Sequence, residues 1–276
     1  MSRTAGRFAD LKAQGRAAFV PFITAGDPDF ETSLAILEAL PGVGADVIEL
    51  GMPFTDPMAD GPAVQASSLR ALKAGATMAR TFELIRAFRK RDAKTPIVLM
   101  GYYNPIHIRG ADLFVREAKE AGADGFIVVD LPPEEDAVLL KPAQSAGMDI
   151  IRLVTPTTHE TRLARVLQGA SGYLYYVSIT GVTGTKSFAE DDVKAALSRI
   201  RKATDLPVAV GFGIRTPAQA AQIAQIADAA VVGSAIVNIV AENQQAGRDA
   251  IVSKVSELCR SLADSIRAAS SAKVQA

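Results

Sequence analysis

Short runs of apolar residues recur along the whole chain, and each is followed by a longer stretch with helical spacing of its apolar positions. The runs are continuous rather than alternating, which is typical of parallel strands buried on both faces. They cover residues 18–24, 45–51, 96–102, 125–130, 149–154, 173–178, 207–213 and 229–234. Between them, segments such as 31–40 and 82–91 carry apolar residues at three- and four-residue spacing and indicate amphipathic helices.

Strands that alternate with helices from end to end predict an α/β protein with a (β/α)₈ TIM barrel. A doubly wound open sheet is the alternative, but such sheets often carry a GxGxxG motif after the first strand. The segment at that place, ITAGDPDFE, lacks this motif. We expect residues 1–276 to form a single barrel domain.

Three features should depart from a minimal barrel. An extra helix within residues 1–16 is expected to cover the N-terminal end, or bottom, of the barrel. Extra helices are expected after the second and eighth strands, because too much helical pattern follows each of them. Residues 268–276 are expected to be a frayed tail, as chain termini often are.

Composition narrows the classes of partner. Lys and Arg together number 30, as do Asp and Glu, so charge gives no argument for nucleic acid or an acidic membrane. Cys259 is the only cysteine, which excludes an internal disulfide and a cysteine metal cluster. No run approaches the ~20 apolar residues that span a bilayer, and the N-terminus lacks an apolar signal region. We therefore expect a cytoplasmic protein without nucleic-acid or membrane partners.

Two carboxyl groups are the strongest candidates for chemistry. Glu49 ends an apolar strand, where a buried carboxylate is costly unless it is paired, hydrogen-bonded or protonated. Asp60 follows across a loop stiffened by Pro53, Pro57 and Pro62. The two acids can face each other across one pocket and transfer protons in both directions. A role as a turn former is the alternative for Asp60, because it precedes Gly-Pro.

The rest of the barrel mouth is mainly apolar or aromatic. Active sites of TIM barrels lie where the strands end and the following loops begin. Tyr175 lies in such a strand, either as a site residue or as a core tyrosine with a satisfied hydroxyl. The pocket lining that suits a flat hydrophobic ring is Phe22, Met100, Tyr102, Ile127, Val129, Leu153 and Phe212.

Glycines late in the chain indicate a phosphate site. Gly213 follows the seventh strand, and Gly233 with Ser234 follows the eighth and opens a short helix. Glycines let a phosphate approach backbone N–H groups, and a helix N-terminus favours an anion. The alternative is that these glycines only form tight corners. Segment 181–187, with Thr183, is a candidate lid. His107 and His159 have no partner at ligand spacing, so surface or N-cap roles are expected and no metal site.

The chain resembles the α subunits of tryptophan synthase. The motifs that carry the resemblance occur in the family's order between about residues 18 and 240: PFITAGDP, ADVIELGMPFTDPMADGPAVQ, MGYYNPI, GADGFIVVDLPPEE, YYVSITGVTG, PVAVGFGI and VVGSAIV. The resemblance implies a lyase of tryptophan biosynthesis that cleaves indole-3-glycerol phosphate to indole and glyceraldehyde 3-phosphate. It also implies no metal and no cofactor in this chain. Pyridoxal phosphate is expected only in a β subunit, within an α₂β₂ heterotetramer.

The resemblance also implies roles for individual residues. Glu49 corresponds to the catalytic acid and base, Asp60 to a carboxylate that faces the indole nitrogen, and Tyr175 to an active-site tyrosine. The implied phosphate cradle consists of Gly184, Gly213, Gly233 and Ser234. The implied pocket and lid positions are Phe22, Tyr102, Thr183 and Phe212. The implied loop facing the β subunit contains Pro53, Asp56 and Pro57.

Three other functions stay open at this point. An indole-3-glycerol phosphate synthase is one, although no strand ends in the lysine that such an enzyme is expected to use. A protein that only binds and activates a β-type partner is the second, and retention of both acids argues against it. A free-standing lyase that releases indole is the third.

Overall fold

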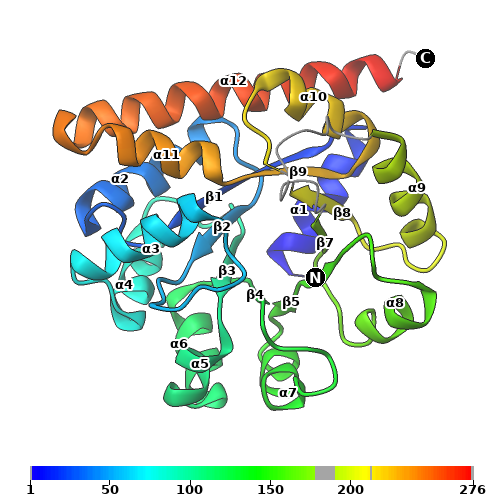
Figure 1. The fold of residues 1–276 in the computed structure, drawn as a ribbon, viewed down its shortest axis with the longest axis horizontal. Helices are drawn as coiled ribbons and strands as arrows, with labels where there is room; N and C mark the ends of the chain where they lie inside the picture. Colours follow the sequence, from blue (N-terminus) through cyan, green and yellow to red (C-terminus); the bar gives the residue numbers. More distant parts are fainter. Residues whose placement is uncertain (1, 178–189, 212, 275–276) are drawn as a thin grey trace.

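The computed structural model describes residues 2–177, 190–211 and 213–274 and has the predicted barrel architecture (Figure 1). Within the described residues, all strand pairs are parallel, in the order β5-β4-β3-β2-β1-β9-β8-β7-β6. The strands are β1 (Ala18–Thr24), β2 (Ile48–Gly51), β3 (Ile97–Gly101), β4 (Gly125–Val128), β5 (Asp149–Ile150), β6 (Arg152–Val154), β7 (Leu174–Val177), β8 (Val208–Gly211) and β9 (Ala229–Val232).

The predicted strand 149–154 differs from the expectation, because it is divided at Ile151 into two short strands. β5 pairs with β4 on one side, whereas β6 pairs with β7 on the other. This run therefore joins the two ends of the sheet, because its first half pairs with one neighbouring strand and its second half with the other. The nine strands of the described chain occupy eight positions of a nearly closed TIM barrel.

Helices surround the barrel on the outside, except for the first, which lies across one end of it (Figure 1). They are α1 (Arg3–Ala13), α2 (Phe30–Ala39), α3 (Pro62–Lys73), α4 (Met78–Arg89), α5 (Tyr103–Arg109), α6 (Ala111–Ala121), α7 (Ala137–Ser145), α8 (Glu160–Val166), α9 (Glu190–Arg201), α10 (Pro217–Ile226), α11 (Ser234–Glu242) and α12 (Arg248–Val274), with short 3₁₀ turns at Pro41–Val43 and Gln244–Ala246. The extra helices expected after the second and last strands are confirmed as α3 with α4 and α11 with α12. The short helix α5, after β3, was not expected.

Capping residues set several helix boundaries. At the start of α10, the Thr216 side chain accepts the N–H of Gln219, and the Gln219 side chain accepts the N–H of Thr216, which forms a capping box. Asp29 and Thr77 cap α2 and α4 without a capping box, because each side chain accepts one backbone N–H and no reciprocal bond is formed. Gly122 ends α6 in the left-handed conformation, as its position after the helical pattern predicts.

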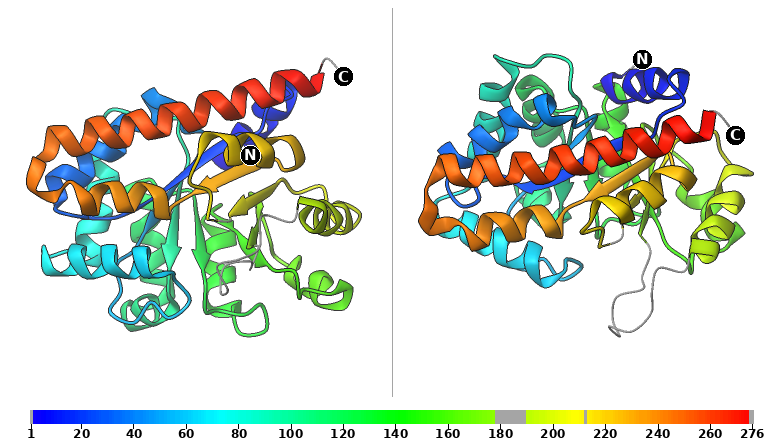
Figure 2. Two further views of the ribbon diagram at one scale, coloured as in Figure 1. Left: turned by 45° about the horizontal axis from the view of Figure 1, so that its top comes forward. Right: turned by 90° about the horizontal axis from the view of Figure 1, so that it is seen from above.

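The C-terminal segment corrects one expectation. Residues 268–274 continue α12 as far as Val274 rather than fraying, whereas 275–276 lie outside the described residues. Ser270 is buried, and its hydroxyl accepts the N–H of Ala17 while donating to the carbonyl of Ile266. This contact and an alanine-rich sequence with high helix propensity hold the last turns in place. Figure 2 shows α12 crossing the molecule, where it packs on α2, α10 and α11.

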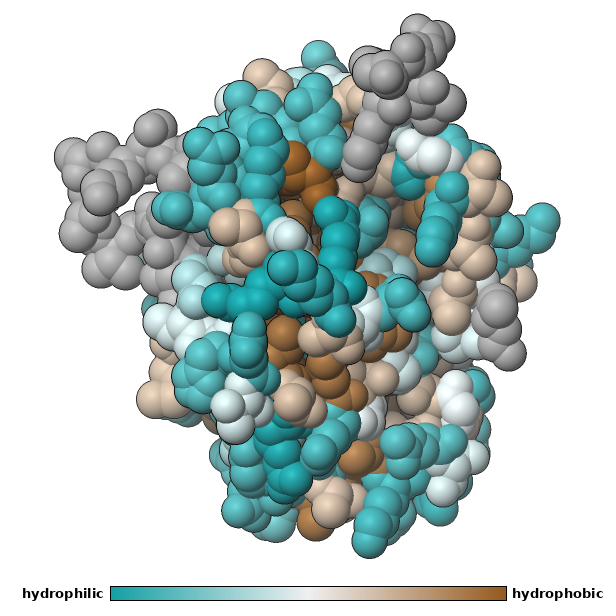
Figure 3. Space-filling model, turned by 90° about the vertical axis from the view of Figure 1, so that its right-hand side faces the viewer, coloured by the Kyte–Doolittle hydropathy of each residue, from teal (hydrophilic) through white to brown (hydrophobic). Residues whose placement is uncertain are grey.

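Apolar side chains form two layers, one inside the barrel and one between the barrel and its helices. The inner layer includes Val98, Ile127, Ile151 and Tyr173, with Phe8 and Leu11 of α1 packed among them. The Phe8 ring lies 5.4 Å from that of Tyr173. Figure 3 shows the side of the molecule near α8 and α9, where hydrophobic surface is confined to narrow hollows between hydrophilic side chains. Within the described residues, no helix is long and apolar enough to cross a membrane.

A repeated aspartate secures the N-terminal ends of the strands. Asp46, Asp124 and Asp228 each follow an alanine and stand just before β2, β4 and β9. Their carboxylates accept backbone N–H groups from the neighbouring strands, namely those of Phe19, Ile97 and Val208 at 2.8, 2.8 and 2.9 Å. The side chains thus supply acceptors at the sheet's end, where regular pairing stops.

The same aspartates attach α1 to the barrel. Asp46 is fully buried and forms ion pairs with Arg7 and Arg16. Asp124 pairs with Arg3 of α1 and with Arg89 of α4. Helix α1 is therefore held at the end of the barrel where the strands begin, both by charge and by the apolar contacts of Phe8 and Leu11.

Asp46→Ala should lower the free energy of unfolding by roughly 3 kcal/mol. It removes a buried partner of two arginines and leaves the Phe19 N–H without its acceptor. Urea denaturation followed by circular dichroism measures this. Asp10→Ala, at an exposed position of α1, is the matched control and should change stability little. Equal stability of the two variants would contradict the anchoring role.

Candidate active site

Glu49 lies inside the barrel wall on β2, beside Phe22 of β1 and Val98 of β3 in the strand register. Its side chain is fully buried. The hydroxyl of Tyr173 donates a hydrogen bond to Oε1 at 2.7 Å, whereas Oε2 has no partner among the described residues. Burial raises the pKa of Glu49 from 4.5 to about 8, although the bond from Tyr173 opposes this. At neutral pH the carboxyl group is therefore mainly protonated and available as an acid.

Sequence reasoning missed Tyr173, the partner of Glu49. A signal was present, because Tyr173 stands two positions before Tyr175 and successive alternate residues of a strand point to the same face. Both belong to the layer of side chains inside the barrel. Burial, and next the negative charge of Glu49, raise the pKa of Tyr173 well above its usual value, so this hydroxyl remains a donor.

Asp60 is half-buried in the loop between β2 and α3. Its side chain is hydrogen-bonded to Tyr102, and its carbonyl accepts a bond from Gln65 Nε2 at 2.8 Å. The Tyr102 hydroxyl also accepts the N–H of Ala59 at 2.9 Å. Burial raises the pKa of Asp60, while the Tyr102 bond opposes the rise. Tyr102 thus attaches the loop carrying the second acid to the end of β3.

Tyr175 connects the two acids electrostatically. Burial raises the pKa of its hydroxyl well above the usual value, and the negative charges of both Glu49 and Asp60 add to this. Tyr175 is therefore close enough to both acids for each of them to influence its hydroxyl group. The Tyr175 ring leans over β8, where a Cβ atom on Gly211 would lie only 2.0 Å from its hydroxyl oxygen. Gly211 is a further residue whose role was not foreseen.

Most of the predicted apolar lining comes together inside the barrel. Met100, Val129, Leu153 and Tyr175 pack against the inner layer that contains Ile127. The Phe22 ring packs against the backbone of two glycines, Gly51 and Gly233. A Cβ atom on Gly51 would lie 2.6 Å from its ring, and one on Gly233 would lie 3.4 Å from it. The Tyr102 ring lies 5.5 Å from that of Phe54.

The predicted phosphate residues that the structure describes follow neighbouring strands. Gly213 has φ +51° and lies two positions after β8, with open space where a side chain would project. Gly233 follows β9 and is the N-cap of α11, whose first residue is Ser234. The positive end of that helix dipole faces the end of the barrel at which the strands finish. Thr183, Gly184 and Phe212, and the lid segment 181–187, lie outside the described residues.

The loop after β2 contains the three residues proposed to face a partner. Pro53 is half-buried, Asp56 is exposed and Pro57 is buried. Two large apolar side chains near this end of the barrel are exposed: Met58 in the same loop at 84% and Ile108 of α5 at 79%.

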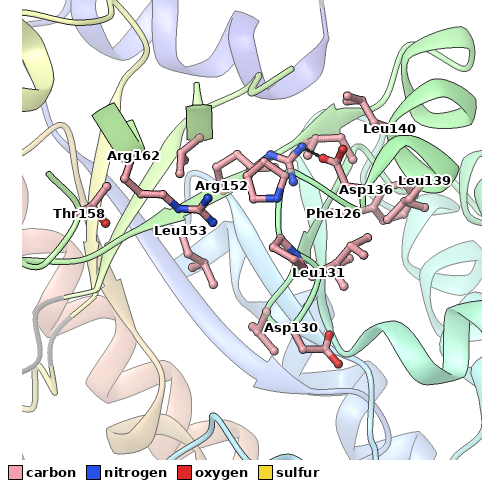
Figure 4. Close-up of a pocket in the computed structure, with 17 residues that line it drawn as sticks. Phe126, Asp130, Leu131, Asp136, Leu139, Leu140, Arg152, Leu153, Thr158 and Arg162 are labelled. Atoms are coloured by element: carbon pink, nitrogen blue, oxygen red, sulfur yellow. Dashed lines mark ion pairs between the residues drawn. The ribbon is translucent and has the colours of Figure 1, made fainter. Parts of the chain in front are cut away.

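A cavity of about 450 Å³ lies beside the mouth, between the ends of β4–β6 and helices α7 and α8 (Figure 4). Val129 and Leu153 border it, but Glu49 and Asp60 do not. Its wall contains a buried ion pair between Arg152 and Asp136, on the side of the strand that faces the helices. Burial lowers the pKa of Arg152. This pair was not predicted, because the apolar run around Arg152 gave no sign of a partner.

The two histidines have the roles expected for them. His159 is the N-cap of α8 and accepts the N–H of Arg162, and His107 packs its ring against Tyr103. Among the described residues, no three His, Cys, Asp or Glu side chains gather as metal ligands would.

The sequence model of the tryptophan synthase alpha chain family matches residues 8–267. The chain belongs to the tryptophan synthase alpha chain family. Members of the tryptophan synthase alpha chain family are carbon–carbon lyases of tryptophan biosynthesis. Their reaction, which this chain shares, is the retro-aldol cleavage of indole-3-glycerol phosphate to indole and glyceraldehyde 3-phosphate.

Solved structures agree with membership of the tryptophan synthase alpha chain family. The tryptophan synthase subunit alpha of Legionella pneumophila str. Paris is 41% identical, with a TM-score of 0.90 over 96% of this chain and 98% of that chain. A chain of Mycobacterium tuberculosis tryptophan synthase, in an open form with BRD0059 bound, is 33% identical, with a TM-score of 0.86 over 97% and 99%. A protein from Aquifex aeolicus VF5 is 34% identical, with a TM-score of 0.87 over 97% and 100%.

The raised pKa of Glu49 should make stability depend on pH. Between about pH 4.5 and about 8 the folded protein holds this proton and the unfolded chain does not, so stability falls as pH rises. The slope from this group is at most about 1.4 kcal/mol per pH unit. Glu49→Gln removes this titrating group. As pH rises towards about 8, the stability of the variant relative to the native protein should therefore increase, and above about pH 8 it should stay constant. Urea denaturation at a series of pH values measures the difference.

Glu120→Gln, which changes an exposed carboxyl group, is the matched control and should show no such trend. Tyr173→Phe removes the bond that lowers the pKa of Glu49, and it should extend the pH-dependent range upwards. A difference between Glu49→Gln and native protein that stays constant with pH would show that Glu49 is not held protonated.

Proposed function

We propose that Glu49 is the proton donor and Asp60 the charge-stabilising carboxylate in the retro-aldol cleavage of indole-3-glycerol phosphate. The observation that carries this proposal is the complete burial of the Glu49 carboxyl group, which raises its pKa to about 8. Asp60 is only half-buried and belongs to the loop after β2, so it reaches the site from a different element than Glu49. Tyr175, whose hydroxyl group is influenced by both acids, would lie against the substrate.

The cleavage requires the indole ring to become a leaving group. Glu49 donates its proton to ring carbon C3, which produces an indolenine cation. Asp60 accepts the ring N–H and stabilises the positive charge. The Glu49 carboxylate then takes the proton of the C3′ hydroxyl group as the C3–C3′ bond breaks, and the bonding electrons return to the ring. One residue thus serves as acid and then as base, and ends the reaction protonated.

The phosphate and the indole ring of the substrate are assigned to different groups of residues in the same site. We assign the phosphate to Gly184, Gly213, Gly233 and Ser234, since the N-terminus of α11 favours an anion. The ring would lie among Phe22, Met100, Tyr102, Ile127, Val129 and Leu153, with Phe212 and Thr183 completing the pocket and its lid. Phosphate binding contributes orientation, so that neither acid alone accounts for the rate.

We also propose that the chain works in an α₂β₂ tryptophan synthase in the cytoplasm, with pyridoxal phosphate only in the β subunit. Pro53, Asp56 and Pro57 would contact that subunit. Met58 of the same loop and Ile108 of α5 are exposed apolar side chains that such a complex could cover. The alternative is that the chain works alone as a free-standing lyase. The reaction in this barrel is the same in either case.

Glu49→Gln should lower kcat for indole release by about 10²–10⁴-fold, because the amide cannot donate and accept the transferred proton. The dissociation constant for the substrate should change only a few-fold, since the shape of the pocket is kept. Stopped assays of indole release measure kcat, and calorimetry measures the dissociation constant of the substrate. Glu120→Gln is the control, with unchanged turnover expected. Near-normal turnover by Glu49→Gln would refute the proton-donor role.

Asp56→Ala should weaken activation by purified β subunit about ten-fold while leaving indole release by the isolated chain unchanged. The exposed side chain lies in the loop proposed to contact that subunit, and it has no part in the proposed proton transfers. Titration of indole release with β subunit measures the effect. Asp10→Ala, on α1, is the control. If β subunit has no influence on the native chain, the free-standing alternative is correct.

A further inference from the structure

Helix α3 connects the two ends of the proposed substrate site. It starts at Pro62, two positions after Asp60, and it packs on both β1 and α11. Figure 1 shows α3 beside α11, the helix whose N-terminus is assigned to the phosphate. Any shift of α3 therefore changes the position of the loop with Asp60 relative to the phosphate cradle.

Polar contacts hold α3 at defined points along its length. Gln65 Nε2 donates to the carbonyl of Asp60 at 2.8 Å. Two positions further, the buried hydroxyl groups of Ser67 and Thr24 lie 2.6 Å apart, and Thr24 is the last residue of β1. The first half of the helix thus links the Asp60 loop to the end of a barrel strand.

Arg70 completes this arrangement on the next turn. Its Nε and Nη2 donate to the two carboxylate oxygens of Asp27, both at 2.8 Å. Nη2 also donates to the carbonyl of Val237 in α11 at 3.4 Å. Asp27 is 3% exposed and lies in the loop after β1. The fork geometry of a guanidinium group suits such a bidentate pair, and an ammonium group cannot reproduce it.

We propose that Arg70 is a positioning residue that couples the phosphate end of the site to Asp60 at the indole end. Its hydrogen bonds go to Asp27 and Val237, and neither residue is among those assigned to the phosphate or the ring. Through Val237 it contacts α11, through Asp27 it holds the loop after β1, and through α3 and Gln65 it holds the Asp60 loop. This inference rests on the proposed function, because it takes the phosphate and ring assignments from it.

The physical consequence concerns how phosphate binding affects the chemical step. Interactions with a remote part of a substrate raise kcat only when they hold the reacting part in place. A rigid connection between α11 and the Asp60 loop transmits that restraint. Without Arg70, the phosphate should still bind, but its binding should no longer place the ring accurately between the two acids.

The test compares indole-3-glycerol phosphate with indole-3-glycerol, which lacks the phosphate. In the native protein, removal of the phosphate should lower kcat as well as raise KM. In Arg70→Met, kcat for the phosphorylated substrate should fall at least ten-fold. In contrast, turnover of indole-3-glycerol should change less than about three-fold, because no phosphate restraint is available to be lost. Arg70→Lys should be intermediate.

Two controls keep the comparison interpretable. Lys73→Met removes an exposed cation from the same helix and should leave both substrates unaffected. Arg70→Met leaves Asp27 buried without its partner, so a second variant, Arg70→Met with Asp27→Asn, removes that charge and should show the same pattern of turnover. Glycerol 3-phosphate should bind to all variants with dissociation constants within about three-fold of the native value, since Arg70 does not contact the phosphate.

The outcomes separate the two levels of the proposal. If the native protein cleaves neither substrate, the proposed function fails and this inference fails with it. If the native protein is active but both Arg70 variants lose the same factor on both substrates, Arg70 is merely structural. Unchanged kcat for the phosphorylated substrate would also overturn the coupling, and so would a large loss of glycerol 3-phosphate binding.

Discussion

Enclosure of the Glu49 carboxyl group within apolar barrel walls is the constraint on which the site depends. Water would ionise an exposed glutamate at neutral pH, whereas among the described residues only Tyr173 donates a hydrogen bond to the buried Glu49. That one bond opposes the effect of burial without cancelling it. Tyr173 in turn packs on Phe8 of α1, a helix held by Asp46 and Asp124 at the opposite end of the strands. The acidity of one residue thus relies on structure through the whole depth of the barrel.

The sequence predicted those parts of the fold that depend on repeated local patterns. Continuous apolar runs identified the strands, and the extra helices followed from the length of helical pattern between them. The division of 149–154 was not predictable, because it results from pairing with two different neighbours. The tail was misjudged because its stability depends on Ser270, which bonds to a residue far away in the sequence.

The candidate site shows the same division. Glu49 was recognisable because a carboxylate at the end of an apolar strand conflicts with local preference, and Asp60 because it follows Glu49 across a loop stiffened by prolines. Tyr173, Gly211 and Arg70 were not, because each resembles an ordinary core, corner or surface residue until its partner is known. The partners lie on other strands or helices, and a single sequence carries no direct record of such contacts. Residues that act through their neighbours are therefore the ones that local reasoning misses.

The absence of a side chain at Gly211 restricts how this protein can change over evolutionary time. The space that a methyl group would fill is occupied by the Tyr175 hydroxyl. A lineage that acquired alanine at this position would have to turn the tyrosine aside or replace it, and either change would alter the surroundings of both acids. The two positions on neighbouring strands are thus free to vary only together, although neither one reveals this when read alone.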